Sequence, residues 1–342
     1  MKKYFFPRKG NFYKANLHCH TTVSDGKFTP EEIKKAYCEK GYSIVAFTDH
    51  EVMIPHGELS DDSFLALDGY EIEIREEGDD FPSKLACHLC FVATREGLDQ
   101  VCWHRSKYLH HGNAQLYKDK VKFDESLADF EREYSPECIN EMIRLGKEGG
   151  FFVTYNHPTW SMERYPQYMC YEGLNAMEIV NNGSAVIGFD DYNPRVYDDM
   201  LYGGKRLYCV ATDDTHKKED LFGGFVMIKA EALEYGSVTR ALLNGDFYSS
   251  QGPEIKEIWF EDNSVYVEAL DAETVNFVTA RRTWRYTTPV EKDNKTCFRF
   301  SVSEADRFVR ITATDKYGKH ANTNAYFFDE LGLFENNIPC LS

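Results

Sequence analysis

Residues 16–50 read NLHCHTTVSDGKFTPEEIKKAYCEKGYSIVAFTDH, and this stretch predicts a strand, a helix and a second strand. Residues 16–20 end the first strand. Thr29 is placed to cap the helix, with Pro30 at its first position and two glutamates in its first turn. Gly41 ends the helix, and the apolar residues 44–47 form the next buried strand. This order predicts an α/β architecture around a largely parallel sheet.

The same design recurs further along the chain. Ser135 and Pro136 open a helix, Gly149 and Gly150 close it, and residues 151–155 follow as a strand. Short apolar runs alternate with helical segments in this way up to about residue 250. Residues 97–134 are polar, aromatic and weakly periodic, so we interpret them as an insertion over the barrel.

The pattern changes from about residue 252. Residues 264–268, 276–280 and 308–313 alternate between apolar and polar side chains, with turn residues between the runs. This predicts a small antiparallel β-domain of the sandwich type. We therefore expect a catalytic barrel over residues 1–251 and an accessory domain over residues 252–342.

Composition excludes several classes of protein. The formal net charge is -17, whereas a general duplex nucleic-acid binder presents a basic face to the phosphates. No apolar run approaches the roughly 20 residues of a membrane helix, and the first residues do not form a signal peptide. The ten cysteines are scattered, and Cys87-x-x-Cys90 is interpreted as part of a buried strand. We expect a cytoplasmic protein with reduced thiols.

Histidines and carboxylates gather where the predicted strands end. Six of the 11 histidines lie at strands or strand ends, and acidic residues accompany most of them. Carboxyl ends of parallel strands converge on one face of a barrel, where active sites are built. A single histidine of this kind is usually structural, but the joint pattern indicates a metal site. The candidate ligands are His18, His20, Asp25, His50, Glu71, His88, His157, Asp214 and His216.

Two of these positions have a competing neighbour. Glu73 shares a strand face with Glu71, because side chains two residues apart point to the same side. Asp213 precedes Asp214 and is a candidate for supporting a ligand. The spacing of the motifs favours Glu71 and Asp214 and leaves both alternatives open.

Taken in order, these residues resemble the PHP (polymerase and histidinol phosphatase) domain family. The motifs are His18-x-His20 with Ser24-Asp25-Gly26, Thr48-Asp49-His50, Gly69-x-Glu71, Asn156-His157-Pro158 and Asp214-x-His216. The resemblance covers roughly residues 11–250. It implies a distorted seven-stranded β/α barrel that holds up to three divalent metals and hydrolyses phosphoesters.

The resemblance also implies how the ligands are shared. His18, His20, Glu71 and Asp214 would hold one metal, and Glu71 would bridge to a second metal held by His88 and His157. Asp25, His50 and His216 would hold the third, and we assign Asp25 and His216 a catalytic role. A mixed histidine and carboxylate set suits Mn, Fe or Zn better than Mg.

The expected activity is hydrolysis of a small phosphorylated metabolite by a metal-activated hydroxide. One alternative is a metal-dependent hydrolase of C–N or other bonds, and another is a metal-stabilised binding module. The sequence indicates neither a specific substrate nor an oligomeric state.

Substrate contacts rest on weaker signals. Arg195 is a candidate for clamping a phosphate, against the alternative of an arginine on a helix surface. Trp160 is a candidate for stacking on a base or sugar, against packing at the rim. Arg105, Lys107, His110 and His111 in the insertion are candidates for a lid, against solvated loop residues.

Overall fold

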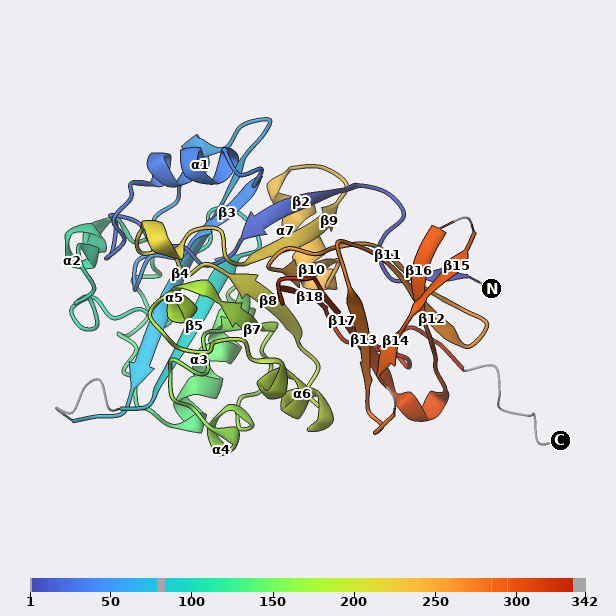
Figure 1. Ribbon diagram of the computed structural model, residues 1–342. Coiled ribbons are helices and arrows are strands. Elements are labelled where there is room, and N and C mark those ends of the chain that lie inside the picture. Colours follow the sequence, from blue (N-terminus) through green and yellow to red (C-terminus); the bar gives the residue numbers. More distant parts are fainter. Residues whose placement is uncertain (1, 79–83, 284, 294, 335–342) are drawn as a thin grey trace.

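Seven consecutive strands form a distorted barrel in the computed structural model, which describes residues 2–78, 84–283, 285–293 and 295–334. They lie in the order β2-β3-β4-β5-β6-β7-β8 (Figure 1). Their bounds are β2 (Asn11–Asn16), β3 (Ile44–Phe47), β4 (Leu65–Arg75), β5 (Ala86–Ala93), β6 (Phe151–Tyr155), β7 (Ala176–Asn181) and β8 (Tyr208–Thr212). A parallel bridge between Cys19 and Thr215 joins the segments that follow β2 and β8 and so closes the ring. The predicted fold class is confirmed.

One strand runs against the expected direction. β2, β3 and β4 are parallel, as are β6, β7 and β8, but β5 is antiparallel to both of its neighbours. His88 therefore does not follow a parallel strand end. It lies near the start of β5, opposite Glu73 of β4, because an antiparallel strand brings its amino end to the edge where its neighbours end.

Helices cover the outside of the barrel (Figure 1). The predicted first helix is confirmed: Thr29 forms a capping box with Glu32, and Pro30 stands in the first turn. The helix predicted from Ser135 is confirmed as well, with Ser135 as its N-cap. The helices are α1 (Pro30–Cys38), α2 (Ala114–Tyr117), α3 (Pro136–Glu148), α4 (Tyr165–Tyr168), α5 (Asn182–Val186), α6 (Pro194–Tyr202) and α7 (Tyr235–Asn244).

Packing of α3 shows how the barrel is held together. Its buried face presents Ile139, Met142 and Ile143 to a core that includes Phe91 of β5 and Val153 of β6. Burial of such side chains contributes about 1.5–3 kcal/mol each.

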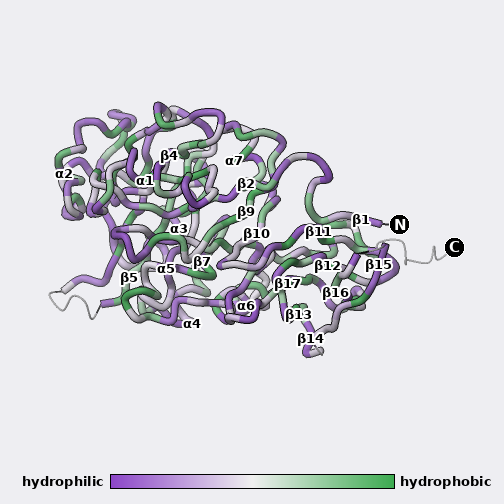
Figure 2. The backbone as a smooth tube through the Cα atoms, turned by 45° about the horizontal axis from the view of Figure 1, so that its top comes forward, coloured by the Kyte–Doolittle hydropathy of each residue, from purple (hydrophilic) through white to green (hydrophobic). Residues whose placement is uncertain are grey.

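Figure 2 shows hydrophilic stretches in the loops around α2, at the outside of the molecule. Among the described residues, no helix is long and apolar enough to cross a membrane.

The C-terminal region is antiparallel, as predicted. One sheet has the order β1-β11-β12-β16-β15, and β14-β13-β17-β18-β10 continues through β9 into the barrel sheet. A shared apolar core, with Ile258 and Val267 on one side and Phe277 and Ile311 on the other, lies between them. The strands are β1 (Lys3–Tyr4), β9 (Phe225–Ala230), β10 (Phe247–Ser250), β11 (Glu254–Glu261), β12 (Ser264–Leu270), β13 (Thr274–Thr279), β14 (Tyr286–Thr287), β15 (Pro289–Lys292), β16 (Lys295–Ser301), β17 (Phe308–Thr314), β18 (His320–Thr323) and β19 (Tyr326–Phe327).

The predicted boundary after residue 251 stays a prediction. β10, on its amino-terminal side, pairs with β18, and β1 pairs with β11. Strands from both predicted domains thus share hydrogen-bonded ladders.

Residues 97–134 contain little regular structure, namely α2 and a short 3-10 turn over Lys118–Lys120. Arg132 joins this segment to the barrel. Its guanidinium donates two hydrogen bonds of 2.7 Å to the carboxylate of Glu51, and both side chains are buried. A bidentate pair of this kind fixes both the distance and the orientation of the two groups.

Candidate metal centre

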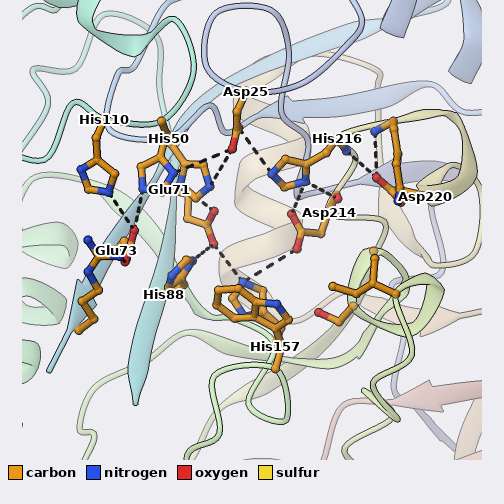
Figure 3. Close-up of a pocket in the computed structure, with 17 residues that line it drawn as sticks. Asp25, His50, Glu71, Glu73, His88, His110, His157, Asp214, His216 and Asp220 are labelled. Carbon is orange, nitrogen blue, oxygen red and sulfur yellow. Dashed lines mark hydrogen bonds and ion pairs between the residues drawn. The ribbon is translucent and has the colours of Figure 1, made fainter. Parts of the chain in front are cut away.

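Seven of the nine predicted ligands line one cavity of about 520 Å3 (Figure 3). The other two, His18 and His20, contact Glu71 and Asp214 of this lining. The segments after β2, β3, β6 and β8 bring most of the nine to one end of the barrel, while β4 and β5 contribute Glu71 and His88 from within strands. Two of the ligand residues have unusual backbones. His157 and Asp214 have positive φ angles of 22° and 49°, which non-glycine residues rarely adopt. Such strain persists only where the surrounding structure enforces it, often at functional sites.

The first ligand set comprises His18, His20, Glu71 and Asp214. His18 Nε2 lies 3.0 Å from His20 Nε2 and 3.3 Å from Glu71 Oε2. Asp214 Oδ1 lies 3.2 Å from the Nε2 atom of each histidine. Atoms bound about 2.0 Å from a tetrahedral ion lie about 3.3 Å from one another. The four side chains therefore have the spacing of a cation site.

The second set shares Glu71 with the first. Glu71 Oε1 lies 3.2 Å from His88 Nδ1 and 3.3 Å from His157 Nε2. Asn156 donates a hydrogen bond of 2.6 Å to the same oxygen and so fixes the carboxylate. Because the other oxygen of Glu71 faces the first set, this carboxylate is placed to bridge two ions.

The third set lies nearer the mouth of the cavity. His216 Nε2 is 3.5 Å from Asp25 Oδ1, and His50 Nε2 is 4.0 Å from Asp25 Oδ2. His20 Nδ1 lies 3.8 Å from Asp25 and brings this set next to the first. The side chains of Asp25 and His216 are 31% and 33% exposed, so both are accessible from the cavity.

The electrostatics of the cluster favour bound positive charge. Burial opposes ionisation of Glu71, yet the imidazoles of His18, His50 and His88 keep its pKa well below the usual range. Conversely, burial lowers the pKa of His20, but Asp214 and Glu71 raise it to about 10. Carboxylates that hold protons on buried imidazoles also attract cations.

Several buried atoms of the candidate ligands lie close to other candidate ligand atoms but form no hydrogen bond of suitable geometry with a described residue. They are His20 Nδ1, His50 Nδ1, His88 Nε2 and Asp214 Oδ1. Buried polar atoms are normally hydrogen-bonded, so a group of such atoms around one cavity requires an explanation. Divalent cations bound by these atoms would explain the missing hydrogen bonds. The side chains present therefore fit a polynuclear metal centre.

The structure separates the two ambiguous pairs by position. Glu71 lies within the cluster, whereas Glu73 contacts His110 and His111 beside it. Asp214 faces the cavity, whereas Asp213 accepts hydrogen bonds from the backbone N–H groups of residues 222–224 and from Tyr37. Burial raises the pKa of Asp213 to about 6.

Of the two candidate substrate contacts Arg195 and Trp160, only Trp160 lines the cavity. Arg195 lies on α6 with its side chain 84% exposed, paired with Asp199 one turn further on, and it does not line the cavity. Its placement corrects the phosphate-clamp interpretation, because an i,i+4 pair holds the guanidinium on the helix surface. Trp160 lines the cavity with its ring edge-on to His88 and His157.

Two of the four residues predicted to form a lid, His110 and His111, line the cavity. Arg105 and Lys107 bind Asp129 and Glu131 within the insertion itself, whereas His110 and His111 line the cavity. Arg75 and Lys217 line it as well. The sequence pattern did not single out either of these two cations.

Sequence reasoning missed Glu178 of β7, which is fully buried behind the first set. Its Oε1 atom accepts from His18 Nδ1 at 2.7 Å and from Thr212 Oγ1 at 2.6 Å. Its Oε2 atom accepts from the backbone N–H of His157 at 2.8 Å. A carboxylate behind a ligating imidazole sets which nitrogen faces the ion. The available signal was a single charge within the apolar run of residues 176–181.

Comparison with known proteins agrees with this geometry. Residues 16–152 match the family model described as PHP domain. This part of the chain is similar to the PHP domain. The match includes six of the nine candidate ligands, from His18 to His88, and ends before the other three. No match to a curated protein was found.

Three solved structures are similar to the chain. A two-domain protein from Bacteroides vulgatus, which contains a predicted PHP-like metal-dependent phosphoesterase, has 14% identity and a TM-score of 0.44, with 92% of this chain and 94% of that chain covered. A Bifidobacterium adolescentis protein, whose assignment as a metal-dependent phosphoesterase is itself a prediction, has 17% identity and a TM-score of 0.40 over 63% and 90%. An amidohydrolase from Chromobacterium violaceum, with bound sulfate and no metal, has 13% identity and a TM-score of 0.38 over 59% and 87%. At these values nothing about the chemistry of this chain follows from them.

Proposed function

We propose that this protein is a metal-dependent hydrolase of phosphoester bonds in a small phosphorylated metabolite. The observation that carries this proposal is the cluster of nine histidine and carboxylate side chains, seven of which line one cavity, with Glu71 in contact with two candidate ligand sets. Bound divalent ions would lower the pKa of water and polarise a phosphoryl oxygen. Mn, Fe and Zn suit this mixed donor set better than Mg.

In this proposal different residues hold the ions, orient the ligands and contact the phosphate. The first set and the His88–His157 set would hold two ions through Glu71, and Glu178 would keep His18 in its ligating orientation. Asp25 and His216 are the partly exposed members of the cluster, and we assign them the contacts with the reacting phosphate. Lys217 and Arg75, which also line the cavity, would neutralise the remaining phosphate charge.

The cavity supports a small substrate. Its volume of about 520 Å3 lies within the range of sites for small molecules, and Trp160 and Ile187 give it two apolar surfaces. A phosphorylated metabolite with an apolar or aromatic part fits such a lining. The cytoplasmic location and the catalytic and accessory domains expected from the sequence remain part of this proposal.

The test is a substrate screen on metal-loaded protein. Inorganic phosphate release from a panel of phosphomonoesters is measured beside ammonia release from a panel of amides, with Asp214→Asn as the inactive control. We expect phosphate release that is lost in the variant. Ammonia release alone would replace the proposal by C–N hydrolysis, and no turnover with a full metal complement would favour a metal-stabilised binding module.

A further inference from the structure

A second group of metal-binding side chains lies beside the cluster. It consists of Glu73 on β4 and the adjacent residues His110 and His111 of the insertion. Glu73 and His110 point toward one another in Figure 3. None of the three belongs to the nine ligands of the main cluster.

The geometry brings three ligand atoms together. Glu73 Oε2 lies 2.6 Å from His111 Nε2 and 3.6 Å from His110 Nε2. All three atoms are within 4.8 Å of one another. Two imidazoles and one carboxylate are a donor set of zinc sites, in which water or substrate takes the remaining position.

The surroundings of these three side chains favour binding of a cation. The Glu73 side chain is 7% exposed, and the His110 side chain is 50% exposed, so the group is anchored in the protein and open to the cavity. Arg75 contacts the second oxygen of Glu73 at 3.2 Å, which leaves Oε2 directed at the histidines. The group adjoins the main cluster, because the ring of His111 stacks on His50 at 3.9 Å between centroids and His111 Nδ1 lies 3.9 Å from Asp25 Oδ2.

We propose that Glu73, His110 and His111 form an additional divalent-cation site that is separate from the main cluster. Two of its ligands come from the insertion and one from the barrel. A bound cation would therefore fasten residues 97–134 over the mouth of the cavity. The site would limit substrate entry by holding the insertion in place.

Metal stoichiometry tests the site without reference to activity. The parent, His110→Ala and Glu73→Gln proteins are saturated with Zn2+, passed through a desalting column and measured by mass spectrometry. Lys107→Ala is the control within the insertion, because Lys107 pairs with Glu131 and is not one of the three candidate ligands. We expect the His110 and Glu73 variants to retain one zinc fewer than the parent and the control.

Two results would overturn the proposal. Equal zinc content in all four proteins would show that the three side chains only hydrogen-bond to one another. Loss of more than one equivalent in either variant would show that they belong to the main cluster.

Limited proteolysis provides a second readout. Leu116 and Leu127 in the insertion have exposed fractions of 76% and 51% and are accessible cleavage sites for chymotrypsin. Zn2+ should slow cleavage in the parent and in Lys107→Ala by at least about tenfold and have little effect in His110→Ala. Equal protection in His110→Ala would contradict a cation that fastens the insertion.

Discussion

At the scale of single residues, two buried carboxylates lie behind the candidate ligands and hydrogen-bond to them or to their loop. Glu178 has no exposed surface, and its two oxygens hold His18 Nδ1 and the backbone of His157. It thereby contacts the His18 side chain of the first candidate set and the His157 backbone of the second. Asp49 acts similarly on the loop that carries Asp25, accepting from the backbone N–H groups of Thr21 and Ser24.

Replacing Glu178 by Gln should weaken metal binding by about 10- to 100-fold while leaving the fold intact, because the amide is isosteric but provides no charge to the His18 imidazole. Competition with a chromogenic chelator measures the change. Glu172→Gln is the matched control, since that side chain is 72% exposed and pairs with Lys205. Equal affinities in both variants would remove Glu178 from the centre.

Alanine substitutions of Lys217 and Arg195 should affect KM differently. Lys217 lines the cavity, and in the proposed function its ammonium binds a phosphate oxygen, so Lys217→Ala should raise KM about tenfold or more. Arg195→Ala should leave KM and kcat unchanged, because its guanidinium is held outside the cavity by Asp199. Steady-state kinetics on a phosphomonoester found in the screen measures both. A larger effect of Arg195 would restore the phosphate-clamp interpretation.

At the scale of elements, the insertion is attached to the barrel by a buried charge pair. Arg132 and Glu51 have side-chain exposures of 2% and 1%. Loss of one partner leaves an unpaired charge without access to water, which makes the attachment sensitive to a single substitution.

We expect Arg132→Ala to lower the free energy of unfolding by about 3–5 kcal/mol. Arg105→Ala, which removes an exposed pair in the same segment, should cause little change. Urea titration followed by circular dichroism compares the two variants. Similar losses in both would mean that the buried pair contributes no more than a surface pair.

Elements with strong local signals were predicted closely, and elements set by long-range pairing were not. The bounds of β3 and β6 match the predicted apolar runs, and Thr29 and Ser135 cap their helices as expected. The reversed direction of β5 was missed, because an apolar run has no preferred direction within a sheet. Nine candidate ligands were predicted from strand-end positions and spaced motifs, but Glu178 was missed because its partners lie 160 and 21 residues away.

At the scale of the whole molecule, the cluster should connect metal binding to global stability. Asp214 and Glu71 stand on different strands or strand ends, and their charges are balanced mainly by histidines that also come from separate elements. A cation held by several of these segments stabilises the folded chain, because the unfolded chain lacks the assembled site.

Removal of metal with a chelator should therefore lower Tm, and addition of Mn2+ or Zn2+ should restore it. One site contributes about 3 kcal/mol when free metal exceeds its Kd 100-fold. Differential scanning fluorimetry measures the shift. A Glu71→Gln, Asp214→Asn variant should show a much smaller response, and an equal Tm with and without metal in the parent would contradict a resident metal centre.

The pairing of β1 with β11 affects the order in which the protein is completed on the ribosome. The partners Lys3 and Phe260 are joined only after the entire barrel has been synthesised. At a synthesis rate of about 5–20 residues per second, β11 is made roughly 12–50 s after β1. β1 is thus translated well before its partner, and it completes its sheet only after residues 254–261 have emerged.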